Sequence, residues 1–201
     1  MQIQFPKTEF AGYIFDCDGT LIDSMPVHYK AWDAAMRQSG LKETLSQDLF
    51  YSLGGVPTLS VAELIAKHYG LTIDPKDVFH LKENLFMDML PEVTLIQPVA
   101  DFARHVAMLG RPVSVASGGP RMVVQRSLQL AGLADLFKVV VTADDVVHGK
   151  PAPDMFLLAA KLMGVAPKSC LVFEDAVPGL QAAEAAGMQC VHVPSRRIAA
   201  A

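Results

Sequence analysis

The stretch Gly12-Tyr-Ile-Phe-Asp16-Cys-Asp-Gly-Thr-Leu21 starts with a short apolar run that ends abruptly in acidic residues and a glycine. A run of this kind predicts a buried strand that opens into a loop. Similar apolar runs recur later in the chain, at residues 112–116, 138–142, 170–173 and 189–193. Helical patterns lie between these runs, at residues 121–131, 154–163 and 179–186. Strands that alternate with helices predict right-handed crossovers and a doubly wound parallel sheet of the α/β class.

The stretch from residue 25 to residue 96 breaks this alternation. It contains a helical pattern at 25–39, another from near Pro57 to Gly70, and a third that runs to Leu90. Asp74 and Pro75 suit the cap and the first position of the third helix. No convincing buried strand interrupts these helices. We therefore expect an α/β core made of residues 1–24 and 96–201, with a helical cap domain at 25–95 inserted after the first strand and its loop.

Composition narrows the class of protein. A chain of 201 residues, 51% of them hydrophobic, can bury the core of one large domain or of a core with one insertion. The formal net charge of −4 and the scattered basic residues argue against a nucleic-acid partner. No apolar run is long enough to span a bilayer, the first residues lack a signal-peptide pattern, and three cysteines make no disulfide framework. We expect a cytoplasmic protein without a membrane partner, either a monomer or a weak homodimer.

Polar residues follow four of the predicted strands in turn. Ligand sites in open parallel sheets lie outside the carboxyl ends of the strands, so these residues are expected to meet at one rim. In chain order they are Asp16 and Asp18, Ser117 and Gly118, Lys150, and Glu174 with Asp175.

Each of these residue types suits a phosphate site. Asp16 and Asp18 are two positions apart and can face the same side near a strand end. A hard cation such as Mg²⁺ relieves the repulsion between crowded carboxylates. Ser117 and the amides after it can donate hydrogen bonds to phosphate oxygens, and Lys150 can offset negative charge beside Asp16. Taken singly, these signals are typical of an ordinary turn, loop, solvated lysine or helix start, but their joint order indicates a functional rim.

Four motifs resemble those of the haloacid dehalogenase superfamily. They are Phe15-Asp-Cys-Asp-Gly-Thr-Leu21, Ala116-Ser-Gly118, Lys150-Pro-Ala-Pro-Asp154 and Phe173-Glu-Asp-Ala176. The resemblance implies a Rossmann-like core. The helical insert is similar to the cap of the β-phosphoglucomutase-like subgroup. Within that subgroup, the segment Gly55-Val-Pro-Thr58 and the overall pattern look most like fructose-1-phosphate phosphatases.

The resemblance also implies roles for the residues of the rim. Asp16 would attack phosphorus and form an aspartyl-phosphate, and Asp18 would act as general acid and then as general base. Mg²⁺ would be bound by the side chains of Asp16 and Asp175 and by the main-chain carbonyl of Asp18. Glu174 would support the metal, either directly or through its ligands. The residues expected to hold the phosphoryl oxygens are Ser117, Gly118 and Lys150. The expected activity is magnesium-dependent hydrolysis of small phosphorylated metabolites, such as fructose 1-phosphate.

In the cap, four residues are compared with positions in the mutase-like relatives. His28 and Trp32 lie four apart on one helical face; plain packing is favoured for Trp32, and for His28 packing and substrate contact are equally open. Lys82 resembles a cap lysine that meets the distal phosphate in mutases, although a solvated helix face explains it equally well. Thr58 stands where β-phosphoglucomutases carry an arginine. Loss of a bidentate phosphate clamp argues against bisphosphate handling.

Other activities are weighed against the phosphatase hypothesis. A phosphosugar mutase would share nearly every core residue. A non-catalytic regulator that binds a phosphorylated metabolite is disfavoured because the core set is complete. Dehalogenase and phosphonate-cleaving activities are disfavoured because Asp18 is present.

Overall fold

A sheet of five parallel strands forms the centre of the protein. The computed structural model describes residues 3–6, 8–54, 56 and 58–194. The sheet has the order β5-β4-β1-β6-β7, with the bounds β1 (Gly12–Phe15), β4 (Val113–Ala116), β5 (Val139–Val141), β6 (Cys170–Glu174) and β7 (Gln189–His192). Because β1 is central, the chain builds the sheet first toward β5 and then toward β7. The predicted doubly wound α/β fold is confirmed, and β1 marks the point where the winding reverses.

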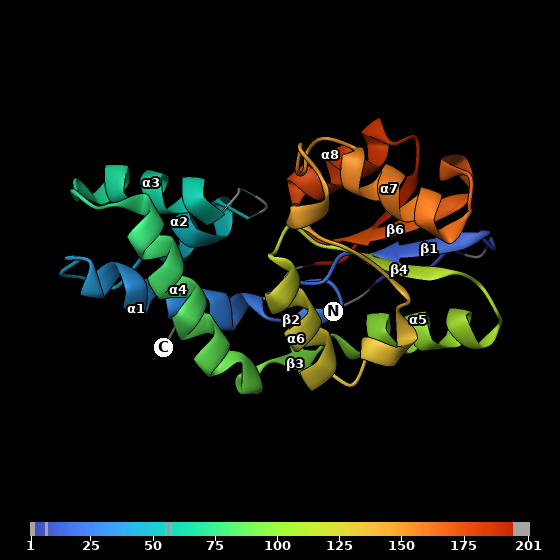
Figure 1. Ribbon diagram of the computed structural model, residues 1–201, viewed down its shortest axis with the longest axis horizontal. Helices are drawn as coiled ribbons and strands as arrows, with labels where there is room; N and C mark the ends of the chain where they lie inside the picture. Colours follow the sequence, from blue (N-terminus) through green and yellow to red (C-terminus); the bar gives the residue numbers. More distant parts are fainter. Residues whose placement is uncertain (1–2, 7, 55, 57, 195–201) are drawn as a thin grey trace.

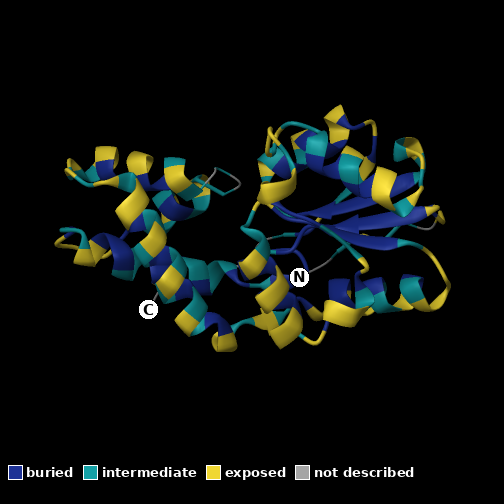
Figure 2. Cartoon of the chain, in the orientation of Figure 1, coloured by how far each residue is buried: buried dark blue, intermediate teal, exposed yellow. Residues whose placement is uncertain are grey.

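Helices cover both faces of this sheet (Figure 1). The helices α5 (Gln97–Met108) and α6 (Arg121–Leu130) lie on one face, and α7 (Asp154–Met163) and α8 (Val177–Ala185) lie on the other. Figure 2 shows that the central strands β1, β4 and β6 are buried while each helix exposes its outer face. The long apolar runs of the sequence follow from this layering, because both faces of each central strand are covered.

The pleat of β1 distributes its side chains between the two layers. Tyr13 and Phe15 belong to the hydrophobic cluster under α5 and α6, whereas Ile14 belongs to the cluster under α7 and α8. The Phe15 ring stacks on that of Phe173 in β6, with 4.9 Å between the ring centroids. All four residues of β1 are therefore buried, and the strand places the acidic loop after it at a rigid position.

Four helices between β2 and β3 form a separate group beside the sheet (Figure 1). They are α1 (Met25–Gln38), α2 (Gln47–Ser52), α3 (Thr58–Tyr69) and α4 (Pro75–Met89). Their apolar faces form a hydrophobic cluster of their own that includes Trp32, Phe50 and Ile65. As predicted for the third helix, the Asp74 side chain accepts a hydrogen bond from the Lys76 amide, and Pro75 is the first helical residue.

Several elements were missed by the sequence analysis. The helix α2 has only six residues, too few for a clear period, and β2 (Ile22–Asp23) and β3 (Thr94–Leu95) are two-residue strands that pair antiparallel with each other. The helix α5 was missed although its buried Val99, Ala103 and Val106 have helical spacing. Short 3₁₀ turns complete the fold, at Leu90–Glu92, Ala134–Leu136, Ala143–Asp145 and Pro167–Ser169. No helix among the described residues has both the length and the apolar character needed to cross a membrane.

Two leucines on α6 test the packing of this face. Leu128 is 2% exposed and belongs to the cluster under α5 and α6, whereas Leu130 is 46% exposed. We expect Leu128→Ala to lower the free energy of unfolding by about 2–5 kcal/mol, because it leaves a cavity. The matched Leu130→Ala change should cost less than about 1 kcal/mol. Chemical denaturation of both variants checks this, and equal losses would contradict the packing described here.

Candidate active site

The carboxyl ends of the three central strands, β1, β4 and β6, lie side by side. Phe15 pairs with Phe173 of β6 and with Val115 of β4, so the residues just beyond them are neighbours. The Asp16 amide donates a hydrogen bond to the Phe173 carbonyl oxygen at 2.9 Å, which anchors the start of the acidic loop. Asp16, Ser117 and Glu174 are all buried there.

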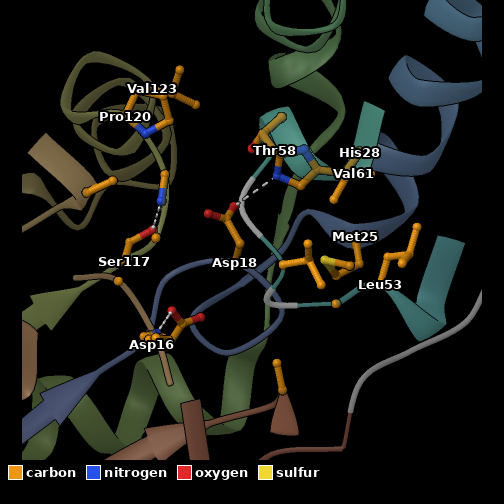
Figure 3. A pocket seen from close by; sticks show the side chains of 18 of the residues that line it. Asp16, Asp18, Met25, His28, Leu53, Thr58, Val61, Ser117, Pro120 and Val123 are labelled. Carbon is orange, nitrogen blue, oxygen red and sulfur yellow. Dashed lines mark hydrogen bonds and ion pairs between the residues drawn. The ribbon is translucent and has the colours of Figure 1, made fainter. Parts of the chain in front are cut away.

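A cavity of about 360 Å³ opens over these strand ends and extends to the helices α1, α3 and α4. Figure 3 shows Asp16 and Ser117 on the sheet side and His28 and Thr58 on the helical side. Every predicted site residue lines this one cavity, namely Asp16, Asp18, His28, Thr58, Lys82, Ser117, Gly118, Lys150, Glu174 and Asp175. The structure thus brings together residues that lie far apart in the sequence.

Lys150 bridges two buried carboxylates. Its Nζ lies 2.6 Å from Asp16 Oδ1 and 2.6 Å from Glu174 Oε1, and its side chain is 7% exposed. Burial alone would lower the pKa of Lys150, but the two carboxylates outweigh burial and raise it. Burial, helped by the negative charge of Glu174, outweighs the ion pair with Lys150 and raises the pKa of Asp16 to about 7. Lys150 is therefore charged, but its single positive charge does not balance the negative charges of the acids around it.

Asp16, Glu174 and Asp175 form a candidate metal centre. Carboxylate oxygens of the three residues lie within 4.8 Å of one another. Burial, followed by repulsion from Asp16 and Glu174, raises the pKa of Asp175 well above its usual range. A set of hard oxygen donors with excess negative charge fits Mg²⁺. Gly19 has a positive φ of 83° and lies against Asp175 so closely that a Cβ there would collide with the carboxylate.

The Asp18 carboxylate makes different contacts from Asp16. It accepts a hydrogen bond from Ser24 Oγ at 2.6 Å. His28 Nε2 lies 3.5 Å from the same oxygen, and Figure 3 shows the two side chains facing each other. Burial would raise the pKa of Asp18, but the hydrogen bonds and charges of these partners outweigh burial and lower it. Asp18 is therefore a carboxylate whose direction is fixed by the start of α1.

The loop after β4 faces Asp18. Ser117 Oγ accepts a hydrogen bond from the Gly119 amide at 3.1 Å, so its own hydrogen can be donated elsewhere. A Cβ at Gly119 would lie 3.4 Å from Ser117 Oγ and 3.9 Å from Asp18 Oδ2. The Ser117 hydroxyl group and the Asp18 carboxylate therefore both lie close to Gly119.

The residues on the helical side of the cavity are more deeply buried than a solvated helix face would allow. The His28 ring stacks on the Phe86 ring, with 3.8 Å between centroids and 4° between planes. Lys82 is 2% exposed and its Nζ donates to Glu83 Oε1 at 2.9 Å, so the solvated-face alternative for Lys82 is wrong. Burial lowers the pKa of Lys82, although Glu83 partly offsets this effect. Trp32 is 3% exposed in the hydrophobic cluster of α1–α4 and also lines the cavity.

Other residues of the cavity were not singled out from the sequence. Gly55 and Pro57, part of the segment compared with phosphatases, lie outside the described residues. The apolar lining was missed because helical spacing does not separate a cavity wall from a packed core. The apolar cavity residues missed in this way include Met25, Phe50, Leu53, Val61 and Val123. Glu83 is a further lining residue that was missed, since it carried no signal except its place beside Lys82.

The fold and this rim define an α/β enzyme with an acidic, lysine-bridged site at the reversal point of the sheet. A sequence model of the haloacid dehalogenase-like hydrolases matches residues 10–187, and the chain belongs to that family. The family resemblance drawn from the four motifs is thus confirmed.

Named relatives include phosphatases. The chain is 40% identical to fructose-1-phosphate phosphatase YqaB of Escherichia coli, over 92% of this chain and 96% of the YqaB chain. Hexitol phosphatase A of the same organism is 32% identical over 90% of this chain and 82% of its own length. A solved β-phosphoglucomutase from Clostridium difficile shares the fold with a TM-score of 0.79, at 23% identity, over 90% of this chain and 83% of its own.

A pair of glycines tests the metal centre. We expect Mg²⁺ to raise the melting temperature of the wild-type protein. Gly19→Ala should abolish this rise, because the added Cβ must displace the Asp175 carboxylate. Gly132→Ala is the matched control, since Gly132 has a positive φ of 66° but open space around it. The control should lose only about 1–2 kcal/mol of stability from backbone strain and keep the Mg²⁺ effect. An undiminished Mg²⁺ effect in Gly19→Ala would contradict the assignment of Asp175.

Proposed function

We propose that the protein is a cytoplasmic, magnesium-dependent phosphatase that hydrolyses small phosphate monoesters, sugar phosphates such as fructose 1-phosphate among them, through an aspartyl-phosphate on Asp16. The observation that carries this proposal is the contact of Lys150 with Asp16 at 2.6 Å, beside the acidic cluster and the Ser117 loop. The identity of 40% with a fructose-1-phosphate phosphatase supports the choice of substrate.

Asp16 is the proposed nucleophile. Lys150 holds its Oδ1, which leaves Oδ2 to attack phosphorus while the bond to the leaving oxygen breaks. The attack needs the ionised carboxylate, and nearby positive charge favours that form. Mg²⁺, held by Asp16, Asp175 and the Asp18 carbonyl, would supply positive charge to the phosphoryl oxygens. The products of this step are the acyl phosphate on Asp16 and an alcohol.

Asp18 is the proposed general acid and base. Ser24 and His28 fix the direction of its carboxylate. The negative charge of a bound phosphate raises the pKa of a neighbouring carboxyl group, which favours the protonated form needed to protonate the leaving oxygen. The carboxylate formed in this way then takes a proton from the water that attacks the acyl phosphate. Inorganic phosphate leaves, and Asp16 and Asp18 return to their starting states.

The remaining core residues hold charge and position. Ser117 Oγ, the Gly118 amide and Lys150 are the proposed donors to the phosphoryl oxygens. Both oxygens of Glu174 already have partners, Lys150 Nζ at 2.6 Å and the Ala176 amide at 2.7 Å. We therefore assign Glu174 to orienting Lys150 and the metal ligands rather than to direct coordination.

Residues 25–95 are the proposed cap domain, joined to the core at the pair β2 and β3. The cap carries the proposed substrate contacts His28, Thr58 and Lys82, and its closure would exclude water from the reaction. Thr58 lacks the positive charge that a second phosphate requires. This disfavours the mutase, and the complete set of core residues disfavours the non-catalytic regulator.

Phosphate release from a panel of sugar phosphates and other small monoesters tests this function. We expect release in the presence of Mg²⁺, fastest with fructose 1-phosphate or a close relative, and none in the presence of a chelator. A folded protein that releases no phosphate from any of them would overturn the proposal. Turnover that needs a bisphosphate primer and yields an isomer would assign the mutase instead.

Two substitutions test the acids. We expect Asp16→Asn to lose all measurable turnover, and Asp18→Asn to lose about 10²–10⁴-fold in kcat, the usual range for general acid–base catalysis. Asp135→Asn, which changes an exposed aspartate, should keep full activity. Circular dichroism shows whether each variant folds. Substantial turnover by folded Asp16→Asn would contradict the nucleophile, and a loss below tenfold in Asp18→Asn would contradict the acid–base role.

A further inference from the structure

The cap side of the cavity contains a buried ion pair between two successive residues of α4. Lys82 and Glu83 both line the cavity, and their side chains are 3% and 13% exposed. Lys82 Nζ donates to Glu83 Oε1 at 2.9 Å and lies 5.0 Å from the centre of the Phe86 ring. The pair is therefore nearly dry, and the proposed chemistry on the sheet side does not use Glu83.

The second oxygen of Glu83 has no protein partner. Glu83 Oε2 is inaccessible to solvent, and no described residue donates a hydrogen bond to it. A buried acceptor without a donor is unfavourable, and each such atom in a folded protein calls for an explanation. Because Glu83 lines the cavity and the terminal torsion of a glutamate is soft, the carboxylate can turn so that a hydroxyl group of a bound molecule supplies the missing donor.

The charge of the pair restricts which molecule this can be. An unpaired buried lysine would attract a second phosphate group. Here the Glu83 carboxylate neutralises Lys82, and a second phosphate would meet a negative charge at close range. The cap side therefore favours an uncharged part of the substrate that carries hydroxyl donors.

We propose that Glu83 determines substrate specificity by accepting a hydrogen bond from a hydroxyl group of the leaving alcohol and by excluding a second phosphate. The substrates are thus monophosphates of sugars or sugar alcohols, and the corresponding bisphosphates are rejected. This inference rests on the proposed phosphatase function and adds the residue that selects among its substrates.

The matched substrates fructose 1-phosphate and fructose 1,6-bisphosphate, with p-nitrophenyl phosphate as a substrate without hydroxyl groups, test the role of Glu83. In Glu83→Gln we expect kcat/KM for fructose 1-phosphate to fall about tenfold relative to p-nitrophenyl phosphate, mainly through KM, because a charge-assisted hydrogen bond is lost. The ratio of kcat/KM for the bisphosphate to that for the monophosphate should rise about tenfold, because Lys82 is no longer neutralised. Glu63→Gln, on an exposed cap glutamate, should leave both ratios unchanged.

The outcomes separate the two proposals. If wild-type protein hydrolyses p-nitrophenyl phosphate and fructose 1-phosphate but both ratios stay unchanged in Glu83→Gln, the role of Glu83 is overturned and the phosphatase function stands. Equal losses on all three substrates would likewise overturn a role in specificity and assign Glu83 to cap packing. If wild-type protein hydrolyses none of them, the phosphatase proposal fails, and the inference about Glu83 fails with it.

Discussion

The ammonium group of Lys150 lies between the carboxylates of Asp16 and Glu174, 2.6 Å from each. Carboxylates at the end of a buried strand are unfavourable, because burial and mutual repulsion both oppose their ionised forms. One lysine partly offsets this cost, and the excess negative charge that it leaves suits a divalent cation. The same charge balance keeps the acids together in the fold and prepares them to meet a phosphate group.

The topology of the sheet explains how this arrangement is held. The strand β1 lies between β4 and β6, so three loops separated in the sequence begin at one edge. The chain passes from the first of these loops through β2 into α1, and Ser24 and His28, at the start of α1, both contact Asp18. A change in the position of α1 therefore acts directly on the carboxylate proposed as general acid. If the proposed cap closes over the substrate, its movement would also act on the orientation of Asp18.

The sheet could be predicted from the sequence because central strands covered on both faces form uninterrupted apolar runs. Most helices could be predicted because their buried residues recur with helical spacing. The helix α2 and the strands β2 and β3 were missed because they are too short for a period to appear. The rim residues could be grouped because each follows a strand, and parallel strands end on one side. Contacts across the fold could not be predicted. They include the close approach of Gly19 to Asp175, the still closer approach of Gly179 to Glu174, and the burial of Lys82 against Glu83. Each depends on how separate elements pack, which no local pattern records.

The proposed mechanism requires Asp16 to carry the phosphoryl group during turnover. Acid quenching during steady-state turnover preserves an acyl phosphate, and borohydride converts that aspartate to homoserine, which mass spectrometry of the peptide containing residues 12–21 detects. We expect homoserine at position 16, formed only when substrate is present. Continued phosphate release without any modified aspartate, or with the modification at another residue, would contradict the proposed mechanism.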